Sequence, residues 1–131
     1  MPAITVFLTS ADRIRIYTPV KSEADAIQRI RGAKVVTFNL PTPTGDLGDT
    51  LEQVWEVTNA APGLTAAQQE AEWEYRFDGE TRSMSVGDVV HVEGLGIFSA
   101  DRIGWKRHDH RLTANAAAHA LRRALGQEAS A

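Results

Sequence analysis

The sequence predicts an α+β fold, in which a single small domain has a curled, mainly antiparallel sheet with two to four packed helices. The chain has 131 residues, about the length of one domain. Its 43% hydrophobic and 24% charged residues are typical of globular proteins. Apolar residues recur with period 2 in some segments and period 3.6 in others, and glycines and prolines separate these segments. We expect the domain to span residues 1–126, followed by a frayed tail at residues 127–131.

The first 40 residues predict strands and one helix. Residues 4–9 and 34–40 are rich in β-branched and aromatic side chains, which favour strands. Residues 14–18 alternate apolar and polar side chains, so we expect a further strand there. Ser22 stands three residues before an acid, which is the spacing of a helix cap, and Gly32 predicts the end of that helix.

Two further helices are expected in the middle of the chain. Thr50 and Gln53 have the spacing of a capping box, and apolar residues follow at i, i+3 and i+4. Asn59 is suited to end this helix in the left-handed conformation. Thr65 begins a second capping box, which predicts a shorter helix that ends at about Glu72.

The last third of the chain predicts short strands and a final helix. Residues 73–77 are expected to be extended. Residues 84–93, 96–100 and 102–107 predict strands that bend at glycines. Thr113 is a candidate cap for the last helix, whose alanine-rich sequence has high helix propensity.

The segment Arg82–Val92 contains a turn followed by a strand. Gly87 can adopt a positive φ at little cost, and Asp88 can accept hydrogen bonds from nearby backbone amides, so the pair predicts a tight turn. The valines after the turn predict a half-buried strand of the sheet. We also expect Trp55 and Trp105 to lie in the core.

The formal net charge of −3 hides an uneven distribution. Residues 41–80 carry nine acids and one base, Arg76, whereas residues 102–123 carry six bases and one acid, Asp109. Such polarity can steer a charged partner toward the protein. The alternative is that both sets are ordinary solvated faces, screened by salt.

The charges give two candidate binding surfaces. Clustered carboxylates can imitate a phosphate backbone and occupy a basic channel of a partner protein. The candidate residues for this surface are Glu52, Glu56, Glu70 and Glu72. In the alternative hypothesis, a basic surface next to an aromatic residue binds nucleic acid, although the negative net charge argues against a dedicated nucleic-acid-binding protein. Its candidate residues are Lys106, Arg107, Arg122 and Arg123.

No pattern of residues predicts catalysis, a cofactor or a metal site. The chain has no cysteine, which excludes disulfides, thiolate zinc sites and a cysteine nucleophile. His108 and His110 would share one face of a strand, and His119 could approach them, but a zinc site needs more ligands and supporting partners. No base is recognisable beside a serine, even with His91 available, and no phosphate-binding loop is present. We therefore expect a non-enzymatic protein without cofactor or metal.

The N-terminal residues and the apolar runs predict a cytoplasmic protein without a membrane span. Residues 1–8 lack the basic start of a secretory signal. No apolar run approaches the roughly 18 residues that a membrane span needs.

Three segments together resemble a known group of proteins. They are Leu-Glu-Gln-Val-Trp-Glu-Val-Thr-Asn at 51–59, Arg-Ser-Met-Ser-Val-Gly-Asp-Val-Val at 82–90, and Ile-Gly-Trp at 103–105. In this order they resemble the YodL-like group of small proteins from phages, plasmids and integrative elements, over residues 48–107. That group typically carries Arg-Ser-Leu-Ser-Val-x-Asp-Val, then a short strand with an aromatic residue and Gly-Phe or Gly-Trp.

The chain departs from the group in two places. Phe98 stands where the group often has Tyr, and the Cys or Val often found near Ala100 is absent. The resemblance implies no catalytic residue. It implies an accessory gene on a mobile element, and our leading hypothesis is an interaction protein, for example an inhibitor that binds a host defence complex.

Overall fold

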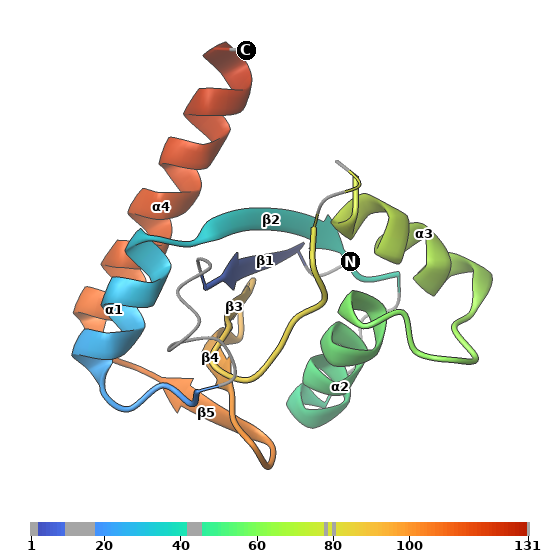
Figure 1. The fold of residues 1–131 in the computed structure, drawn as a ribbon, viewed down its shortest axis with the longest axis horizontal. Coiled ribbons are helices and arrows are strands. Elements are labelled where there is room, and N and C mark those ends of the chain that lie inside the picture. The colour runs from blue at the N-terminus through green and yellow to red at the C-terminus, as the bar shows by residue number, and fades with distance from the viewer. Residues whose placement is uncertain (1–2, 10–17, 42–45, 78, 80, 131) are drawn as a thin grey trace.

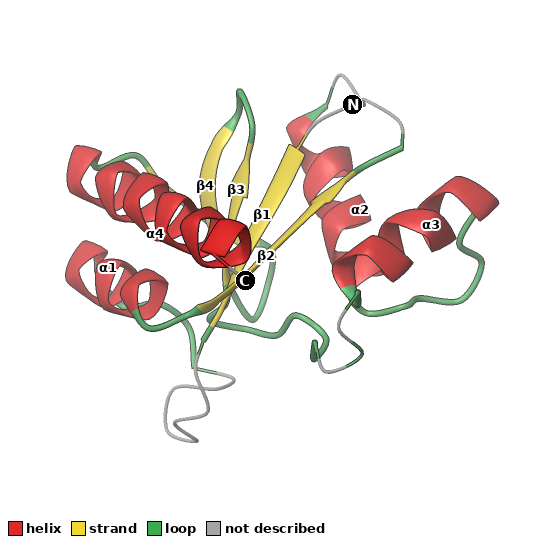
Figure 2. Cartoon of the chain, turned by 90° about the horizontal axis from the view of Figure 1, so that it is seen from above, coloured by secondary structure: helices red, strands yellow, loops and turns green. Residues whose placement is uncertain are grey.

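A five-stranded antiparallel sheet lies between two pairs of helices, α1 with α4 and α2 with α3 (Figures 1 and 2). This computed structural model describes residues 3–9, 18–41, 46–77, 79 and 81–130, with side chains as far as residue 126. The elements are β1 (Ala3–Leu8), α1 (Glu23–Arg31), β2 (Lys34–Asn39), α2 (Leu47–Thr58), α3 (Ala66–Tyr75), β3 (Val89–Val92), β4 (Gly96–Ala100), β5 (Trp105–His108) and α4 (Arg111–Ser130). The predicted α+β fold is confirmed, and the sheet is open rather than closed into a barrel.

The strand order is β2-β1-β3-β4-β5, and every neighbouring pair is antiparallel. Because side chains alternate along a strand, Ile4, Val6 and Leu8 pack with α2 and α3, whereas Phe7 packs with α1 and α4. β1 is therefore buried on both faces, which explains why Thr5 is its only polar residue.

The sheet separates two cores. The larger core, on the α2–α3 side, contains Tyr75 edge-on to Phe38, with ring centroids 5.6 Å apart. Trp55 and Trp105 also meet edge-on, at 6.2 Å, but both are partly buried and lie at the margin of this core rather than within it. The smaller core, on the α1–α4 side, is closed by alanines of α4. α4 therefore contributes only small side chains to this core.

The helix starts were predicted with mixed success. Ser22 caps α1, and Thr65 forms the expected capping box of α3. The predicted capping box at Thr50 is wrong, because Asp46 caps α2 one turn earlier and Thr50 lies inside the helix. Asn59 is not left-handed, since its φ is −102°.

α3 is longer than predicted. Residues up to Tyr75 are helical, so the prediction of an extended segment at 73–77 is wrong. Burial of Ala71 and Tyr75, one turn apart, favours continuation of the helix. The Tyr75 hydroxyl also donates a hydrogen bond to the carbonyl of Arg82, at 2.7 Å, which fixes this end of α3.

The strands after residue 80 are shorter than the predicted ones. The predicted strand at 84–93 is reduced to β3, because residues 85–88 form a turn closed by a hydrogen bond from Asp88 N to Ser85 O. The strand predicted at 102–107 begins only at Trp105, after a turn at Gly104 with φ of 73°.

The remaining predictions concern the cap of the last helix, the strand at 14–18 and membrane spans. Thr113 does not cap α4, which begins at Arg111. The strand predicted at 14–18 falls mostly outside the described residues. Within the described part of the chain, no helix is long and apolar enough to cross a membrane.

Candidate functional site

The two helix layers differ in charge. Residues 46–76, which contain α2 and α3, carry seven acids and one base, Arg76. Residues 111–126 of α4 carry three bases and no acid. Because the sheet lies between these layers, the polarity of the sequence becomes a polarity between two faces of the molecule (Figure 2).

The four predicted acidic residues occupy different environments. Glu52 is exposed on α2, and Glu56, one turn later on the same side, is partly exposed. Glu70 is exposed on α3. Glu72 is partly buried and forms an ion pair with Arg76, with 2.7 Å between Oε1 and Nε. The structure therefore leaves three of the four carboxylates available to a partner and uses Glu72 internally.

The single base of this layer is also used internally. Arg76 donates hydrogen bonds to the carbonyls of Thr58 and Thr81, at 2.7 and 2.9 Å, and to the hydroxyl of Ser83, at 2.9 Å. It thus connects the end of α2, the end of α3 and the segment that follows. Its charge is directed into the protein, so the solvent side of the layer is acidic.

Two exposed aromatic residues, Trp73 on α3 and Phe77 in the turn that follows α3, were not predicted from the sequence. The side chain of Trp73 is 71% exposed and that of Phe77 is 91% exposed. Glu70, Trp73 and Glu74 have the i, i+3, i+4 spacing of one face of α3, and Phe77 follows in the turn after the helix. Extending the predicted helix past residue 72 would have placed Trp73 on the same face as Glu70. Exposed large aromatics beside charges are typical of protein interfaces.

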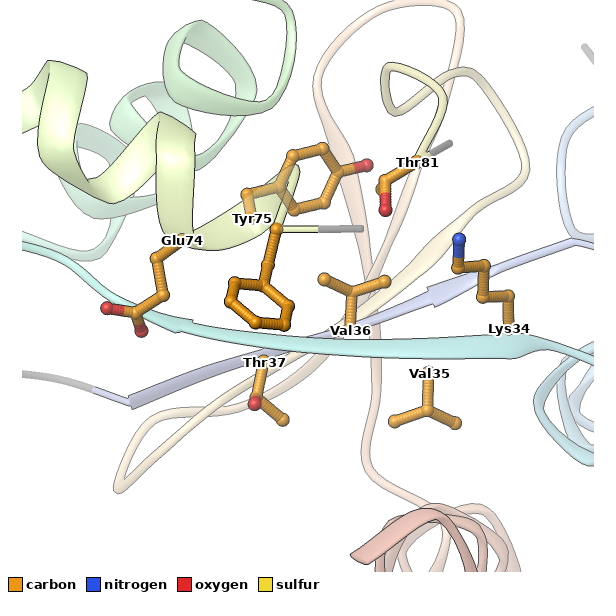
Figure 3. Close-up of a pocket in the computed structure, with 8 residues that line it drawn as sticks. Lys34, Val35, Val36, Thr37, Glu74, Tyr75 and Thr81 are labelled. Atoms are coloured by element: carbon orange, nitrogen blue, oxygen red, sulfur yellow. The ribbon is translucent and has the colours of Figure 1, made fainter. Parts of the chain in front are cut away.

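Phe77 borders a hollow of about 490 Å³ between the end of α3 and β2 (Figure 3). Tyr75 lines it from the end of α3, Phe77 lines it from the turn that follows, and Val36 lines it from β2. Glu74 borders the hollow and accepts hydrogen bonds from the backbone and side-chain nitrogens of Asn39, at 2.9 and 3.2 Å. Lys34 also lines the hollow, at the opposite end from Glu74, so a hollow of mixed polarity with one base and one acid adjoins the exposed aromatics (Figure 3).

The predicted basic residues lie on different faces. Lys106 and Arg107 are consecutive in β5, so their side chains point to opposite faces of the sheet. Arg107 lies over the ring of Phe98, on the α2–α3 side, and forms an ion pair with Asp109 at 2.7 Å. Arg122 and Arg123 are on α4, on the other side of the sheet, so this set does not form one continuous surface.

A series of hydrogen-bonded polar groups, buried except for the partly exposed Glu23, joins β4, β5, α1 and α4. Ser99 Oγ lies 2.8 Å from His108 Nε2, and His108 Nδ1 lies 2.9 Å from Glu23 Oε1. Thr113 donates to the other oxygen of Glu23, at 2.6 Å. Burial tends to raise the pKa of Glu23, but the hydrogen bonds from Thr113 and His108, with the charges of His108 and His110, lower it below 4.5.

Ser99, His108 and Glu23 are connected in the order of a hydrolytic Ser-His-acid triad, which the sequence did not suggest. However, Ser99 is 1% exposed and His108 is 3% exposed, so no acyl group can reach the hydroxyl in this structure. Ser99 also lies within β4 rather than on a sharp turn before a helix. The arrangement is suited to holding α1 and α4 against the sheet.

The other histidines do not join His108 in a metal site. β5 ends at His108, and His110 instead caps α4 by accepting a hydrogen bond from the backbone nitrogen of Leu112, at 3.1 Å. The expectation that His108 and His110 share a strand face is therefore wrong. Among the described residues, no three His, Asp or Glu side chains gather as metal ligands.

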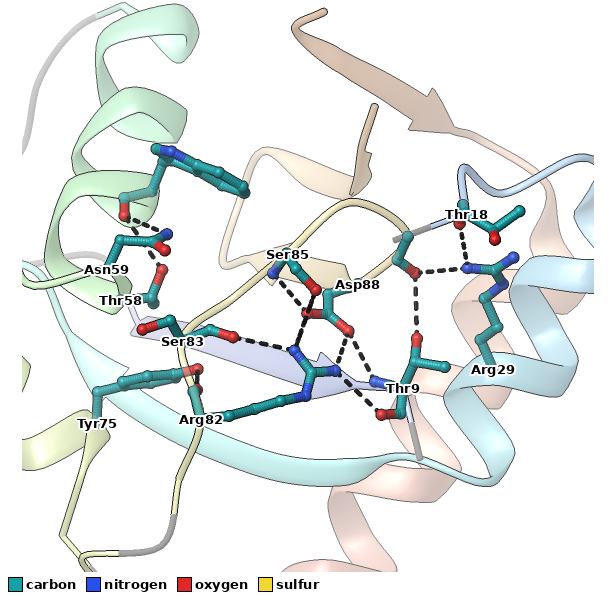
Figure 4. A network of polar contacts seen from close by, with 12 residues as sticks. Thr9, Thr18, Arg29, Thr58, Asn59, Tyr75, Arg82, Ser83, Ser85 and Asp88 are labelled. Carbon is teal, nitrogen blue, oxygen red and sulfur yellow. Dashed lines mark hydrogen bonds and ion pairs between the residues drawn. The ribbon is translucent and has the colours of Figure 1, made fainter. Parts of the chain in front are cut away.

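The motif at 82–90 forms a polar network that is internal to the fold (Figure 4). Asp88 accepts hydrogen bonds from Arg82 and from the backbone nitrogens of Thr9 and Ser85. Gly87 has a φ of 92°, as predicted. These contacts give the conspicuous residues of the motif a structural role.

Comparisons with known proteins identify no relative. No protein-family model matches the chain, and neither a curated protein nor a solved structure is significantly similar to it.

Proposed function

We propose that this chain is a non-enzymatic interaction protein that binds a basic surface of a partner protein through its α2–α3 layer. The carboxylates of Glu52, Glu56 and Glu70 would provide the charge, and Trp73 and Phe77 would provide buried contact area. The resemblance to the YodL-like group extends the proposal to an accessory protein of a phage or plasmid, with a host defence complex as the partner.

The observation that carries the proposal is the exposure of two large aromatics in an acidic layer. Trp73 and Phe77 are 71% and 91% exposed, and solvated faces that have only a solubilising role seldom carry such residues. The only base of residues 46–76, Arg76, is bonded internally. A basic protein surface with an apolar centre would complement both features.

The first experiment identifies the partner and excludes bridging nucleic acid. The tagged protein is used to capture proteins from a nuclease-treated host lysate, and captured proteins are purified for binding measurements. Complex formation should weaken steeply with added salt, because attraction between exposed charges is screened. Binding of DNA or RNA alone, lost on substitution of Lys106, Arg107, Arg122 and Arg123, would contradict the proposal and favour the nucleic-acid alternative.

The second experiment tests the surface itself. The triple variant Glu52→Lys, Glu56→Lys, Glu70→Lys retains Glu72, because its ion pair with Arg76 supports the fold. We expect this variant to lose binding while it keeps its thermal midpoint, since exposed substitutions usually change stability by less than about 0.5 kcal/mol. The matched control is Glu93→Lys, an exposed acid on the β3–β4 turn.

The aromatics are tested in the same way. Trp73→Ala and Phe77→Ala should each weaken binding by about tenfold or more, as is usual for aromatic residues at the centre of an interface. Leu125→Ala is the control, because Leu125 is an exposed apolar residue of α4, on the opposite side of the sheet. Equal affinity of all these variants would show that the α2–α3 layer is not the binding surface.

A further inference from the structure

A second hollow, of about 340 Å³, lies between the sheet and α4, on the face opposite to the acidic layer. Its floor includes Thr5, His91 and Ile97, which stand side by side because Thr5 pairs with His91 and His91 pairs with Ile97. The residues of α4 that border it are Ala114, Ala117, Ala118 and Leu121. Since three of these carry only a methyl group, α4 spans the sheet here without filling the space beneath it.

Two polar side chains of the floor have no hydrogen-bond partner among the described residues, namely Thr5 and His91. Thr5 is only 5% exposed, so its hydroxyl is largely removed from bulk water. The adjacent His108 differs, because both of its ring nitrogens are bonded, to Ser99 and Glu23. The Thr5 hydroxyl is nevertheless not fully enclosed, because the buried side-chain polar atom without a hydrogen-bond partner among the described residues is Gln53 Oε1 and not Thr5 Oγ1. Thr5 and His91 can therefore both form hydrogen bonds to a molecule that enters the hollow.

The chemistry of the walls restricts the class of molecule. Phe7, Ile97 and the α4 residues give the hollow a mainly apolar lining. Burial lowers the pKa of His91 below its ordinary value of 6.5, so the ring is neutral at neutral pH and has one donor and one acceptor nitrogen. The described residues that line the hollow include no lysine or arginine, so no side chain there would balance the charge of an anion.

We propose that this hollow binds a small uncharged molecule with an aromatic or aliphatic body and one amide-like group, which bonds to Thr5 and His91. The volume is within the range of small-molecule sites, and so is the combination of apolar walls with a few polar groups. The site is independent of the proposed protein interface, because the sheet lies between them. Its ligand would be held by shape and two hydrogen bonds rather than by charge.

Three probes with one ring each test the class of ligand. Benzamide is uncharged and both donates and accepts, benzoate has a similar shape but is an anion, and toluene lacks the polar group. Each probe is titrated into the ¹⁵N-labelled protein and followed by NMR. We expect benzamide to shift resonances of β3 and of residues 114–121 in α4, and to bind at least about tenfold more tightly than either other probe.

Variants separate binding from stability. Thr5→Val keeps the shape of the side chain and removes the hydroxyl; it should weaken benzamide binding by about tenfold without lowering the thermal midpoint, because the hydroxyl has no partner to lose. Ala118→Phe should fill the hollow and abolish binding. Ala67→Phe is the control, because Ala67 is an exposed alanine of α3, on the other side of the sheet.

Two outcomes would overturn the proposal. If benzamide shifts no resonance around the hollow, the hollow holds only water. If Thr5→Val lowers the thermal midpoint and leaves benzamide affinity unchanged, the hydroxyl has a structural role and does not contact a ligand.

Discussion

The guanidinium of Arg82 forms a two-pronged ion pair with the carboxylate of Asp88, in which Nη1 lies 2.7 Å from Oδ2 and Nη2 lies 2.7 Å from Oδ1. Asp88 is 1% exposed, and its oxygens also accept hydrogen bonds from the backbone nitrogens of Thr9 and Ser85, both at 2.8 Å. Arg82 in turn donates to the carbonyl of Thr9, at 3.0 Å. The pair therefore ties the end of β1 to the segment that leads into β3.

Removal of Arg82 should destabilise the protein strongly. Arg82→Met leaves a buried carboxylate without its counter-charge, and we expect the free energy of unfolding to fall by about 3–5 kcal/mol. Arg82→Lys should recover only part of this loss, because an ammonium group cannot form the two parallel hydrogen bonds. Urea unfolding measures both values, with Arg102→Met as the exposed control. A loss equal to that of the control would show that the pair contributes little.

Gly87→Ala should be more damaging than the backbone angle alone requires. A Cβ at Gly87 would collide with Arg29 Nη1 and with the carbonyl oxygen of Thr18. Gly94 is the matched control, since its φ of 79° is similar but a Cβ there would meet no atom within 4 Å. We expect Gly94→Ala to cost about 1–2 kcal/mol from strain and Gly87→Ala to cost more. Equal thermal midpoints for the two variants would contradict the close approach at Gly87.

Trp55→Ala should cost less than deletion of a fully buried tryptophan. Trp55 is partly buried and contacts Trp105 edge-on, at 6.2 Å between ring centroids. The loss in unfolding free energy should therefore fall below the range of about 3–5 kcal/mol for buried aromatics. A double-mutant cycle with Trp105→Ala should give a coupling of about 0.5–1.5 kcal/mol for the ring pair. A coupling near zero would indicate that the two rings are stabilised separately.

His91 should make stability depend on pH in the neutral range. Burial lowers its pKa in the folded protein below the ordinary value of 6.5, so the unfolded chain binds the proton more readily. The stability due to neutral His91 is therefore present above the unfolded pKa and is lost as the pH falls toward the folded pKa. Unfolding free energies of the wild type and of His91→Gln, measured between pH about 8 and about 5.5, should converge at the acidic end. Parallel curves would refute this prediction, and NMR titration of the His91 ring provides a direct check.

Several features followed from residues close together in the chain. The cap of α1 at Ser22, the capping box of α3 at Thr65 and the positive φ of Gly87 were all predictable. Each depends on hydrogen bonds or steric limits within about four residues, so the identities of neighbouring residues are enough to predict it. The strand β1 was also predictable, because its β-branched and aromatic residues favour strands.

The candidate sites were less predictable. The uneven charge was visible in the sequence, but its separation onto two faces depends on the sheet order that puts α2 and α3 opposite α4. The exposed Trp73 was missed because the end of α3 was placed too early, and Phe77 lies in the turn beyond that helix. That end depends on Tyr75, which packs on Phe38 of β2.

The fold class, most of the elements and the local turn at Gly87 could be predicted from the order of residues, because each of these is encoded by periodicity or by nearby residues. The partners of distant groups depend instead on how the layers pack. Asp88 meets Thr9 across 79 residues, and His108 meets Glu23 across 85 residues. The hollow above Thr5 and His91 likewise exists only because small α4 side chains lie over two paired strands. Such contacts depend on which faces pack together, and that is a property of the assembled layers.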